Sequence, residues 1–165
     1  MRFTSDSIWK SLFLHIKKLN MKKLIIMLIS VISIYSASAQ KYTDQYIKDA
    51  SIVAESWLSN INDNQYDNAF QMLSNEVKVR YKQETWINLI NELMLEFGEL
   101  ESRKTTEKKF QSEVEGMEDG FYVFIDYTSS YTNTIDHNEH ILLKQNDKTK
   151  WEIVDYNYEF KNKEK

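Results

Sequence analysis

Four potential metal ligands fall within five consecutive positions late in this chain. The run is Asp136-His137-Asn138-Glu139-His140, and histidine together with carboxylate suits zinc or copper. Polar residues also cluster at turns, and this spacing matches no pair of ligands on a helix. We therefore interpret the run as a solvated turn, keep His137 and His140 only as weak candidates for metal ligands, and expect no cofactor.

Arg103 is a candidate for binding an anion, and Asp126 is a candidate for acid–base chemistry. A guanidinium inside a protein needs a carboxylate partner or a bound anion. Asp126 lies on a neighbouring expected strand and could be that partner, whereas a structural or surface ion pair is the simpler alternative. If Asp126 faced a cavity with a raised pKa, it could serve a small enzyme of the isomerase or hydratase type.

Large aromatic side chains are frequent, and they could either line a ligand pocket or fill a core. The candidates for a pocket are Trp57, Tyr66, Trp86, Tyr122 and Trp151. Together with Arg103, we take Trp57, Tyr66, Trp86 and Tyr122 as the expected ligand-binding set.

Motifs for covalent or phosphate chemistry are missing from the sequence. There is no cysteine, no G-x-S-x-G, no phosphate-binding loop and no Ser/His/Asp spacing. This pattern favours a non-enzymatic protein over an enzyme.

Residues 21–40 have the three parts of a secretory signal in order. Lys22 and Lys23 precede the apolar run Leu24–Ile34, and Ala37-Ser38-Ala39 is a small-x-small cleavage pattern. The apolar run is shorter than the roughly 20 residues of a spanning helix. We expect residues 21–39 to be a cleaved signal, residues 1–20 to be a misannotated upstream extension, and residues 40–165 to be one domain, periplasmic or extracellular.

Cleavage would leave an acidic chain. Residues 40–165 hold 15 Lys and Arg against 24 Asp and Glu, a net charge of −9. Such a surface repels phosphate backbones and anionic lipids, so we expect no nucleic-acid partner and no membrane span after cleavage.

The first half of this domain has helical periodicity. Apolar residues at positions 46, 47, 50, 53, 54, 57, 58 and 61 form the stripe of an amphipathic helix, with Thr43 as its expected N-cap. A short helix with Asp67 near its start follows, and a third runs from about Glu84 to Phe97, where Gly98 closes it. The segment Val77–Tyr81 has no clear assignment.

The second half has the period of strands. The expected strands are Phe121–Thr128, His140–Lys144 and Trp151–Tyr158. Asn146–Thr149 is a turn by composition, and Leu100–Ser112 suits either a helix or, as we favour, the first arm of a hairpin. Helices followed by closely spaced strands predict an α+β domain, with an antiparallel sheet covered by helices on one face.

Several residues at these spacings resemble the bacterial family called domain of unknown function 4019, from about Ala50 to Tyr158. The matching features are Trp57-Leu58, Tyr66 with Phe70, Trp86, Gly98 five residues before Arg103, Gly116, Asp119 to Val123, Glu139, Trp151 to Ile153, and Tyr156. Asn64 departs from the family at a position where glycine is common.

The resemblance implies a cone-shaped fold like nuclear transport factor 2, in which three helices are cupped by a curved four-stranded antiparallel sheet. It also favours the strand interpretation of Leu100–Ser112, but it implies no activity. We expect an exported module that binds a small ligand or an envelope protein. The alternatives are the cavity enzyme with Asp126 and a structural part of a larger assembly.

Overall fold

The structure is a computed structural model that describes the backbone of residues 21–163 and the side chains of residues 41–163. The expectation for residues 1–20 therefore lies outside the described residues, as do the side chains of the expected signal. The chain divides after Tyr42 into two units, and the second unit is the subject here. The elements are α2 (Met21–Asn62), α3 (Tyr66–Gln71), α4 (Asn75–Arg80), α5 (Gln83–Phe97), β1 (Leu100–Gln111), β2 (Tyr122–Tyr131), β3 (Thr134–Gln145) and β4 (Trp151–Asn162).

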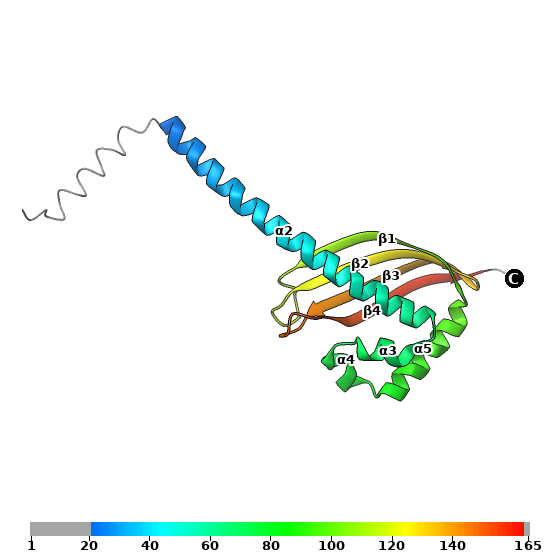
Figure 1. The fold of residues 1–165 in the computed structure, drawn as a ribbon. Coiled ribbons are helices and arrows are strands. Elements are labelled where there is room, and N and C mark those ends of the chain that lie inside the picture. Colours follow the sequence, from blue (N-terminus) through cyan, green and yellow to red (C-terminus); the bar gives the residue numbers. More distant parts are fainter. Residues whose placement is uncertain (1–20, 164–165) are drawn as a thin grey trace, which may run out of the picture. The chain divides into compact units, whose positions relative to one another are not determined.

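The second unit is an α+β domain with a four-stranded antiparallel sheet in the order β1-β2-β3-β4. Figure 1 shows α3, α4 and α5 gathered on one side of this sheet, with the C-terminal part of α2 running along it. The expected α+β class with a four-stranded antiparallel sheet is confirmed. The strand interpretation of Leu100–Ser112 is confirmed by β1.

The C-terminal part of α2 packs through the predicted stripe. Ala50 and Ala54 are fully buried, and small side chains there let the helix approach the sheet closely. The helix runs through Thr43, so the prediction of an N-cap at that residue is wrong. It ends before Asn64, whose φ of 58° lies in the left-handed region that asparagine tolerates better than most residues.

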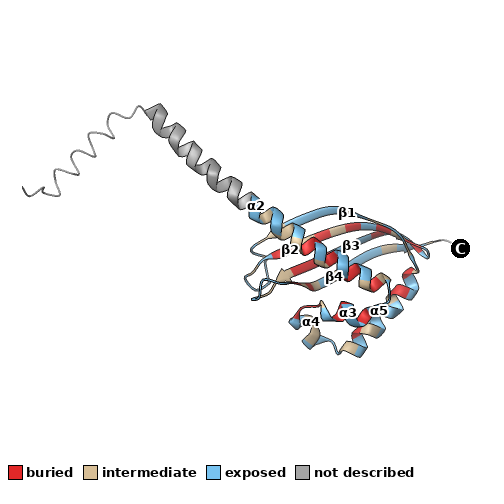
Figure 2. Ribbon diagram, viewed as in Figure 1, coloured by how far each residue is buried: buried red, intermediate tan, exposed pale blue. Residues whose placement is uncertain are grey.

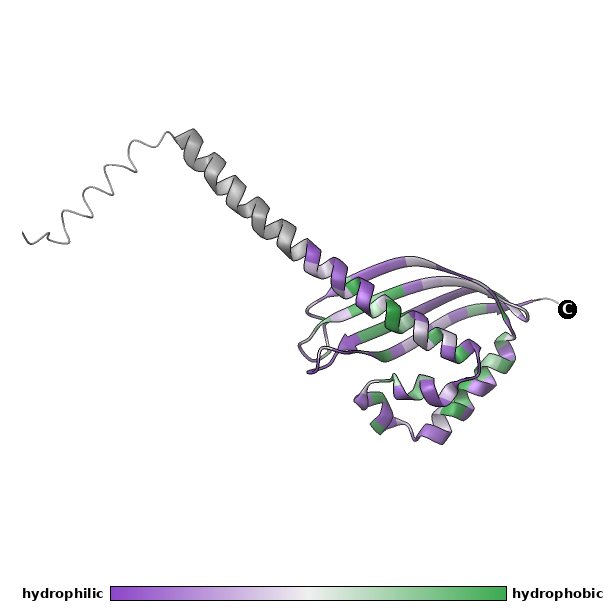
Figure 3. Cartoon of the chain, in the orientation of Figure 1, coloured by the Kyte–Doolittle hydropathy of each residue, from purple (hydrophilic) through white to green (hydrophobic). Residues whose placement is uncertain are grey.

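Four helices are described, not three, because the unassigned segment Val77–Tyr81 mostly belongs to α4. The Ser74 side chain caps this helix by accepting a hydrogen bond from the Val77 N–H. Figure 3 shows hydrophobic residues recurring between hydrophilic ones along α5. Gly98 follows α5 with a φ of 80°, which confirms the predicted glycine at the helix end.

The strands β3 and β4 are longer than the sequence predicts. The polar run Asp136–His140 lies inside β3, so its interpretation as a turn is wrong. The actual β2–β3 turn is Thr132-Asn133, while the predicted turn at Asn146–Thr149 is confirmed by the hydrogen bond from the Thr149 N–H to the Asn146 carbonyl.

The two faces of the sheet differ in burial. Figure 2 shows buried residues recurring along β2, β3 and α2. In β4, a register shift opposite Leu142 and Leu143 pairs Leu143 with Ile153 but Ile141 with Tyr156. This irregularity brings Tyr156 onto the face of Ile153, beneath the helices, although simple alternation places them on opposite faces.

Within the described part of the chain, no helix has both the length and the apolar character needed to cross a membrane.

Candidate functional site

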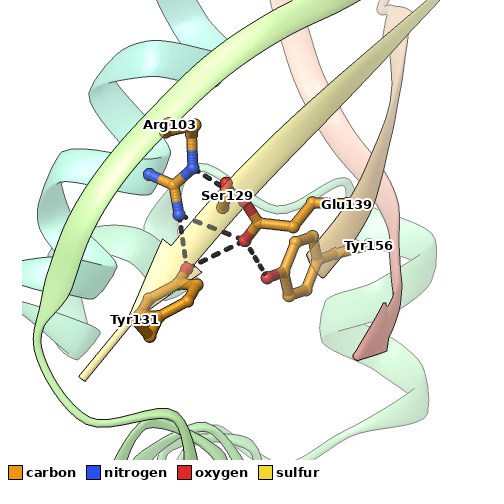
Figure 4. Close-up of polar contacts among 5 residues, drawn as sticks. All are labelled: Arg103, Ser129, Tyr131, Glu139 and Tyr156. Carbon is orange, nitrogen blue, oxygen red and sulfur yellow. Dashed lines mark hydrogen bonds and ion pairs between the residues drawn. The ribbon is translucent and has the colours of Figure 1, made fainter. Parts of the chain in front are cut away.

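Glu139 is the centre of a buried polar cluster on the helix-covered face of the sheet. Glu139 is 0% exposed, and its carboxylate accepts five hydrogen bonds from four side chains. Arg103, Ser129, Tyr131 and Tyr156 are the donors, and Figure 4 shows them converging from β1, β2 and β4. Because a carboxylate has about four lone-pair positions, this one is saturated.

Arg103 binds Glu139 through two nitrogens. Its Nε lies 2.8 Å from Oε2, its Nη2 lies 3.1 Å from Oε1, and its side chain is only 11% exposed. The register of the strands places Arg103 near Glu139. Arg103 on β1 pairs with Ser129 on β2, and Ser129 pairs with His137 on β3, two residues from Glu139. A bidentate guanidinium–carboxylate pair is the strongest ordinary form of this contact. The expected partner, Asp126, is therefore the wrong one.

Three hydroxyl groups complete the cluster. The Tyr131 and Tyr156 hydroxyls donate to Oε1 at 2.9 and 2.7 Å, and the Ser129 hydroxyl donates to Oε2. Arg103 Nη2 also donates to the Tyr131 hydroxyl at 2.6 Å. Burial and the nearby Glu139 carboxylate raise the pKa of Tyr156 well above its ordinary value, so the phenol keeps its proton and remains a donor.

The cluster stabilises a charged carboxylate and is poorly suited to proton transfer. Burial alone would raise the pKa of Glu139, but the hydrogen bonds and charge of Arg103 outweigh it and the pKa is lowered. A general base works best with a pKa near the operating pH. The arrangement is therefore a structural pin that joins all four strands of the sheet.

An apolar groove lies beside this cluster, between α4, α5 and β4. Its volume is about 360 Å³. The buried indoles of Trp57 and Trp86 and the buried side chains of Leu73 and Ile153 contribute to its wall. Exposed residues that line it are Tyr81, Leu89 and Tyr158, together with Arg80 and Asp155. The groove thus combines a buried aromatic wall with apolar groups open to solvent.

Tyr156 connects the groove to the polar cluster. Its ring lines the groove and meets the Trp57 ring edge-on, with 5.2 Å between the ring centres. Its hydroxyl is held by Glu139 at 2.7 Å. The ion pair between Arg103 and Glu139 therefore fixes the orientation of one groove wall.

Asp126 lies on the opposite face of the sheet from this groove. It pairs with His140 at 2.9 Å, and both side chains are partly open to solvent. Asp126 lines a hollow of about 450 Å³ on this outer face and does not line the groove beneath the helices, so the placement of Asp126 inside the cup of the fold is wrong.

The two weak metal candidates also separate. His140 is on the outer face with Asp126, whereas His137 is buried against Phe97, Tyr131 and Phe160. Its Nε2 contacts the Thr134 hydroxyl. Side chains three apart in an extended strand face opposite sides, so the two imidazoles cannot share a metal ion. Within residues 41–163, no three His, Asp or Glu side chains group as a metal site.

The expected ligand-binding residues do not line one pocket. Trp57 and Trp86 line the groove, while Arg103 belongs to the polar cluster. Tyr66 lines a separate polar hollow of about 790 Å³ near the end of α2. Tyr122 is buried elsewhere, where its hydroxyl donates to the Glu118 carbonyl and Lys144 lies over its ring. Trp151 packs near Tyr46.

Sequence reasoning missed three residues that matter here. Glu139 lies in a polar run that resembles a turn, Tyr156 enters the sequence analysis only as a position that matches the family, and Leu89 is not among its candidates. The available signal for Glu139 is an acidic residue two positions before the apolar run Ile141-Leu142-Leu143.

The family comparison agrees with the resemblance seen in the sequence. The family described as "Protein of unknown function (DUF4019)" matches residues 53–156. This match covers more than half of the chain, and the chain belongs to that family. Comparisons with curated proteins and with solved structures found no match.

His137 gives the fold a specific response to acid. Burial lowers its pKa, the Arg103 charge adds to that effect, and the Glu139 charge opposes it. A histidine in an unfolded chain titrates near pH 6.5. Below about pH 6.5, the His137 imidazole therefore binds a proton in the unfolded chain but stays neutral in the folded chain. We expect the free energy of unfolding to fall as the pH is lowered from about 7 to about 5.

Urea unfolding at a series of pH values measures this dependence. His137→Phe should remove the fall above pH 5, because phenylalanine does not titrate. His140→Gln is the matched control on the exposed face and should keep it. An unchanged pH profile in His137→Phe would contradict the assignment. A second fall below about pH 4.5 includes Glu139, whose lowered pKa favours the folded state only while the carboxylate is charged, as do the lowered pKa values of Glu101 and Glu118.

Proposed function

We propose that this protein is a non-enzymatic binding module that holds a small apolar ligand in the groove between α4, α5 and β4. The observation that carries the proposal is the composition of the groove, with two indoles and Tyr156 behind solvent-exposed Leu89 and Tyr158. Small-molecule sites are mostly concave, apolar and largely preformed, with volumes of roughly 300–1,000 Å³. A cavity of about 360 Å³ falls within that range.

The walls of the groove are held in place before any ligand enters, and this supports its use as a binding site. The hydrogen bond between Tyr156 and Glu139 holds one wall, and Trp57 contacts both Trp86 and Tyr156 through their rings. A wall fixed before binding loses little conformational freedom when a ligand enters. The saturated, low-pKa carboxylate nearby favours a binding role over catalysis.

Two further expectations belong to this proposal. We propose that the domain is a cone of the nuclear transport factor 2 type, since helices cover one face of its antiparallel sheet. We also propose that it acts outside the cytoplasm after cleavage at Ala39, on the evidence of the signal pattern in residues 21–39. N-terminal sequencing of the exported protein should find Gln40 first.

Two exposed leucines of α5 provide a direct test. Leu89 lines the groove and is 51% exposed, whereas Leu95 lies outside it and is 71% exposed. We expect naphthalen-2-ylmethanol, at 100 times its dissociation constant, to stabilise the wild-type full chain and Leu95→Asp by about 2.7 kcal/mol. Leu89→Asp should lose most of this stabilisation, because a carboxylate in the groove wall opposes an apolar ligand.

Thermal unfolding with and without the probe measures the difference. Both aspartate variants should keep nearly wild-type stability without the probe, because exposed substitutions usually change it little. Equal stabilisation of Leu89→Asp and Leu95→Asp would show that the probe binds elsewhere. No stabilisation of the wild type by this probe or by a library of apolar small molecules would contradict the proposed function.

A further inference from the structure

One residue that lines the groove carries a buried hydrogen-bond donor without an acceptor. Trp57 is 1% exposed, and its indole N–H has no hydrogen-bond partner among the described residues. Trp57 is also a lining residue of the groove. Buried donors are nearly always paired. The Trp151 indole N–H is also buried and unpaired, but of these two indoles only Trp57 lines the groove. A ligand atom with a lone pair would supply the acceptor that the Trp57 N–H lacks.

The same groove is lined by a cationic side chain that has no ion-pair partner among the described residues. Arg80, the last residue of α4, is exposed and lines the groove. Across residues 41–163, no carboxylate lies within ion-pair distance of its guanidinium. Lys78, two residues earlier in α4, does not line the groove and instead donates to the Gln71 carbonyl at 2.7 Å.

Asp155 is the acidic residue of the lining, and its carboxylate is engaged on the other side. The Asn157 amide donates to it at 2.6 Å, and both residues also line a hollow on the outer face of the sheet. The groove is therefore lined by an exposed, unpaired guanidinium and by an indole whose buried N–H has no acceptor, whereas its acidic residue is hydrogen-bonded to a neighbour. This polarity favours a ligand that accepts hydrogen bonds and carries negative charge.

We propose that the ligand of this groove is a small organic acid, with a flat apolar body against the indoles and a carboxylate that takes the Trp57 N–H and the Arg80 guanidinium. This inference rests on the proposed function and adds the chemical class of the ligand. The apolar body supplies affinity through burial, and the carboxylate supplies selectivity.

Three probes with one ring system test the charge. They are naphthalene-2-carboxylate, naphthalen-2-ylmethanol and naphthalen-2-ylmethylammonium, titrated into the full chain by calorimetry. We expect the carboxylate to bind tightest and the ammonium weakest. Arg80→Gln should weaken the carboxylate roughly two- to five-fold, the range of an exposed ion pair, and leave the alcohol unchanged. Lys78→Gln should change neither.

The Trp57 indole tests the hydrogen bond. Trp57→Phe should weaken the carboxylate about ten-fold or more, as expected for a bond to a charged group, and weaken the alcohol less. In the wild type, the indole N–H resonance of Trp57 should move downfield with the carboxylate, a readout that does not depend on the variant folding.

The outcomes separate the two proposals. If the alcohol and the ammonium bind as tightly as the carboxylate, the organic-acid inference is wrong and the apolar binding site stands. The inference also fails if Lys78→Gln weakens the carboxylate as much as Arg80→Gln. If none of the three probes binds, the proposed function fails and this inference falls with it.

Discussion

Replacing Glu139 by alanine is expected to lower the free energy of unfolding by about 3–5 kcal/mol, the range for breaking a buried ion pair. The change leaves the Arg103 guanidinium, 11% exposed, without its carboxylate. It also removes the acceptor of the Ser129, Tyr131 and Tyr156 hydroxyls, three donors that have little access to other acceptors. Urea unfolding at pH 7 measures the loss.

The matched control is Glu159→Ala on β4, an exposed glutamate whose loss should change stability by less than about 0.5 kcal/mol. A second comparison replaces both partners, as Arg103→Met with Glu139→Met. Such replacements are often neutral for isolated buried pairs. Here the double variant should remain destabilised, because the three hydroxyls still lack an acceptor. A double variant as stable as the wild type would contradict the role given to the hydroxyls.

Replacing Gly98 by alanine is expected to destabilise the fold by about 2–6 kcal/mol, from two separate effects. Gly98 has φ 80° and ψ −158°, a region that is almost restricted to glycine. A Cβ added there would also overlap the Thr132 hydroxyl and lie 2.9 Å from the Asn133 amide group. Those residues form the β2–β3 turn, which bonds to the end of α5 through the Asn133 N–H and the Phe97 carbonyl.

Gly116 separates the two effects. It has the same φ of 80°, but an added Cβ would meet nothing within 4 Å. Gly116→Ala should therefore lose about 1–3 kcal/mol of stability from backbone strain alone. Its urea unfolding midpoint should lie at a higher concentration than that of Gly98→Ala. If both variants lost the same stability, the close approach of Gly98 to the β2–β3 turn would have no energetic role.

Local signals explain what the sequence could predict. The apolar stripe from Tyr46 to Ile61, the alternation around Val123 and the glycine after Phe97 each depend on neighbours a few residues away. These signals were enough for the α+β class and for most of the elements, although α4 was left unassigned and the strand at Leu100–Gln111 was also favoured by the family resemblance.

The site depended on longer-range information. The register shift in β4 moves the Tyr156 side chain to the face opposite the one that simple alternation predicts, and no pattern within that strand indicates the shift. The partner of Arg103 is 36 positions away on β3, and it became visible only once the sheet placed β1, β2 and β3 side by side. Similarly, the groove is made by residues of α2, α4, α5 and β4, whose proximity is a property of the fold.

The pin and the groove form one arrangement. Arg103 and Glu139 hold the Tyr156 hydroxyl, the Tyr156 ring supports Trp57, and Trp57 lies against Trp86. A charged network that is expensive to break therefore orients an aromatic wall that a ligand can use. In the proposed function, the buried ion pair serves binding as well as stability.

The indole N–H signals of the ¹⁵N-labelled full chain test the central claim most directly. Trp57 and Trp86 line the groove, and Trp151 is buried outside it, so each spectrum contains its own control. Titration with naphthalen-2-ylmethanol should shift the Trp57 and Trp86 signals in a saturable way and leave Trp151 in place. A saturable shift of Trp151 with Trp57 and Trp86 unmoved would contradict a binding site between α4, α5 and β4.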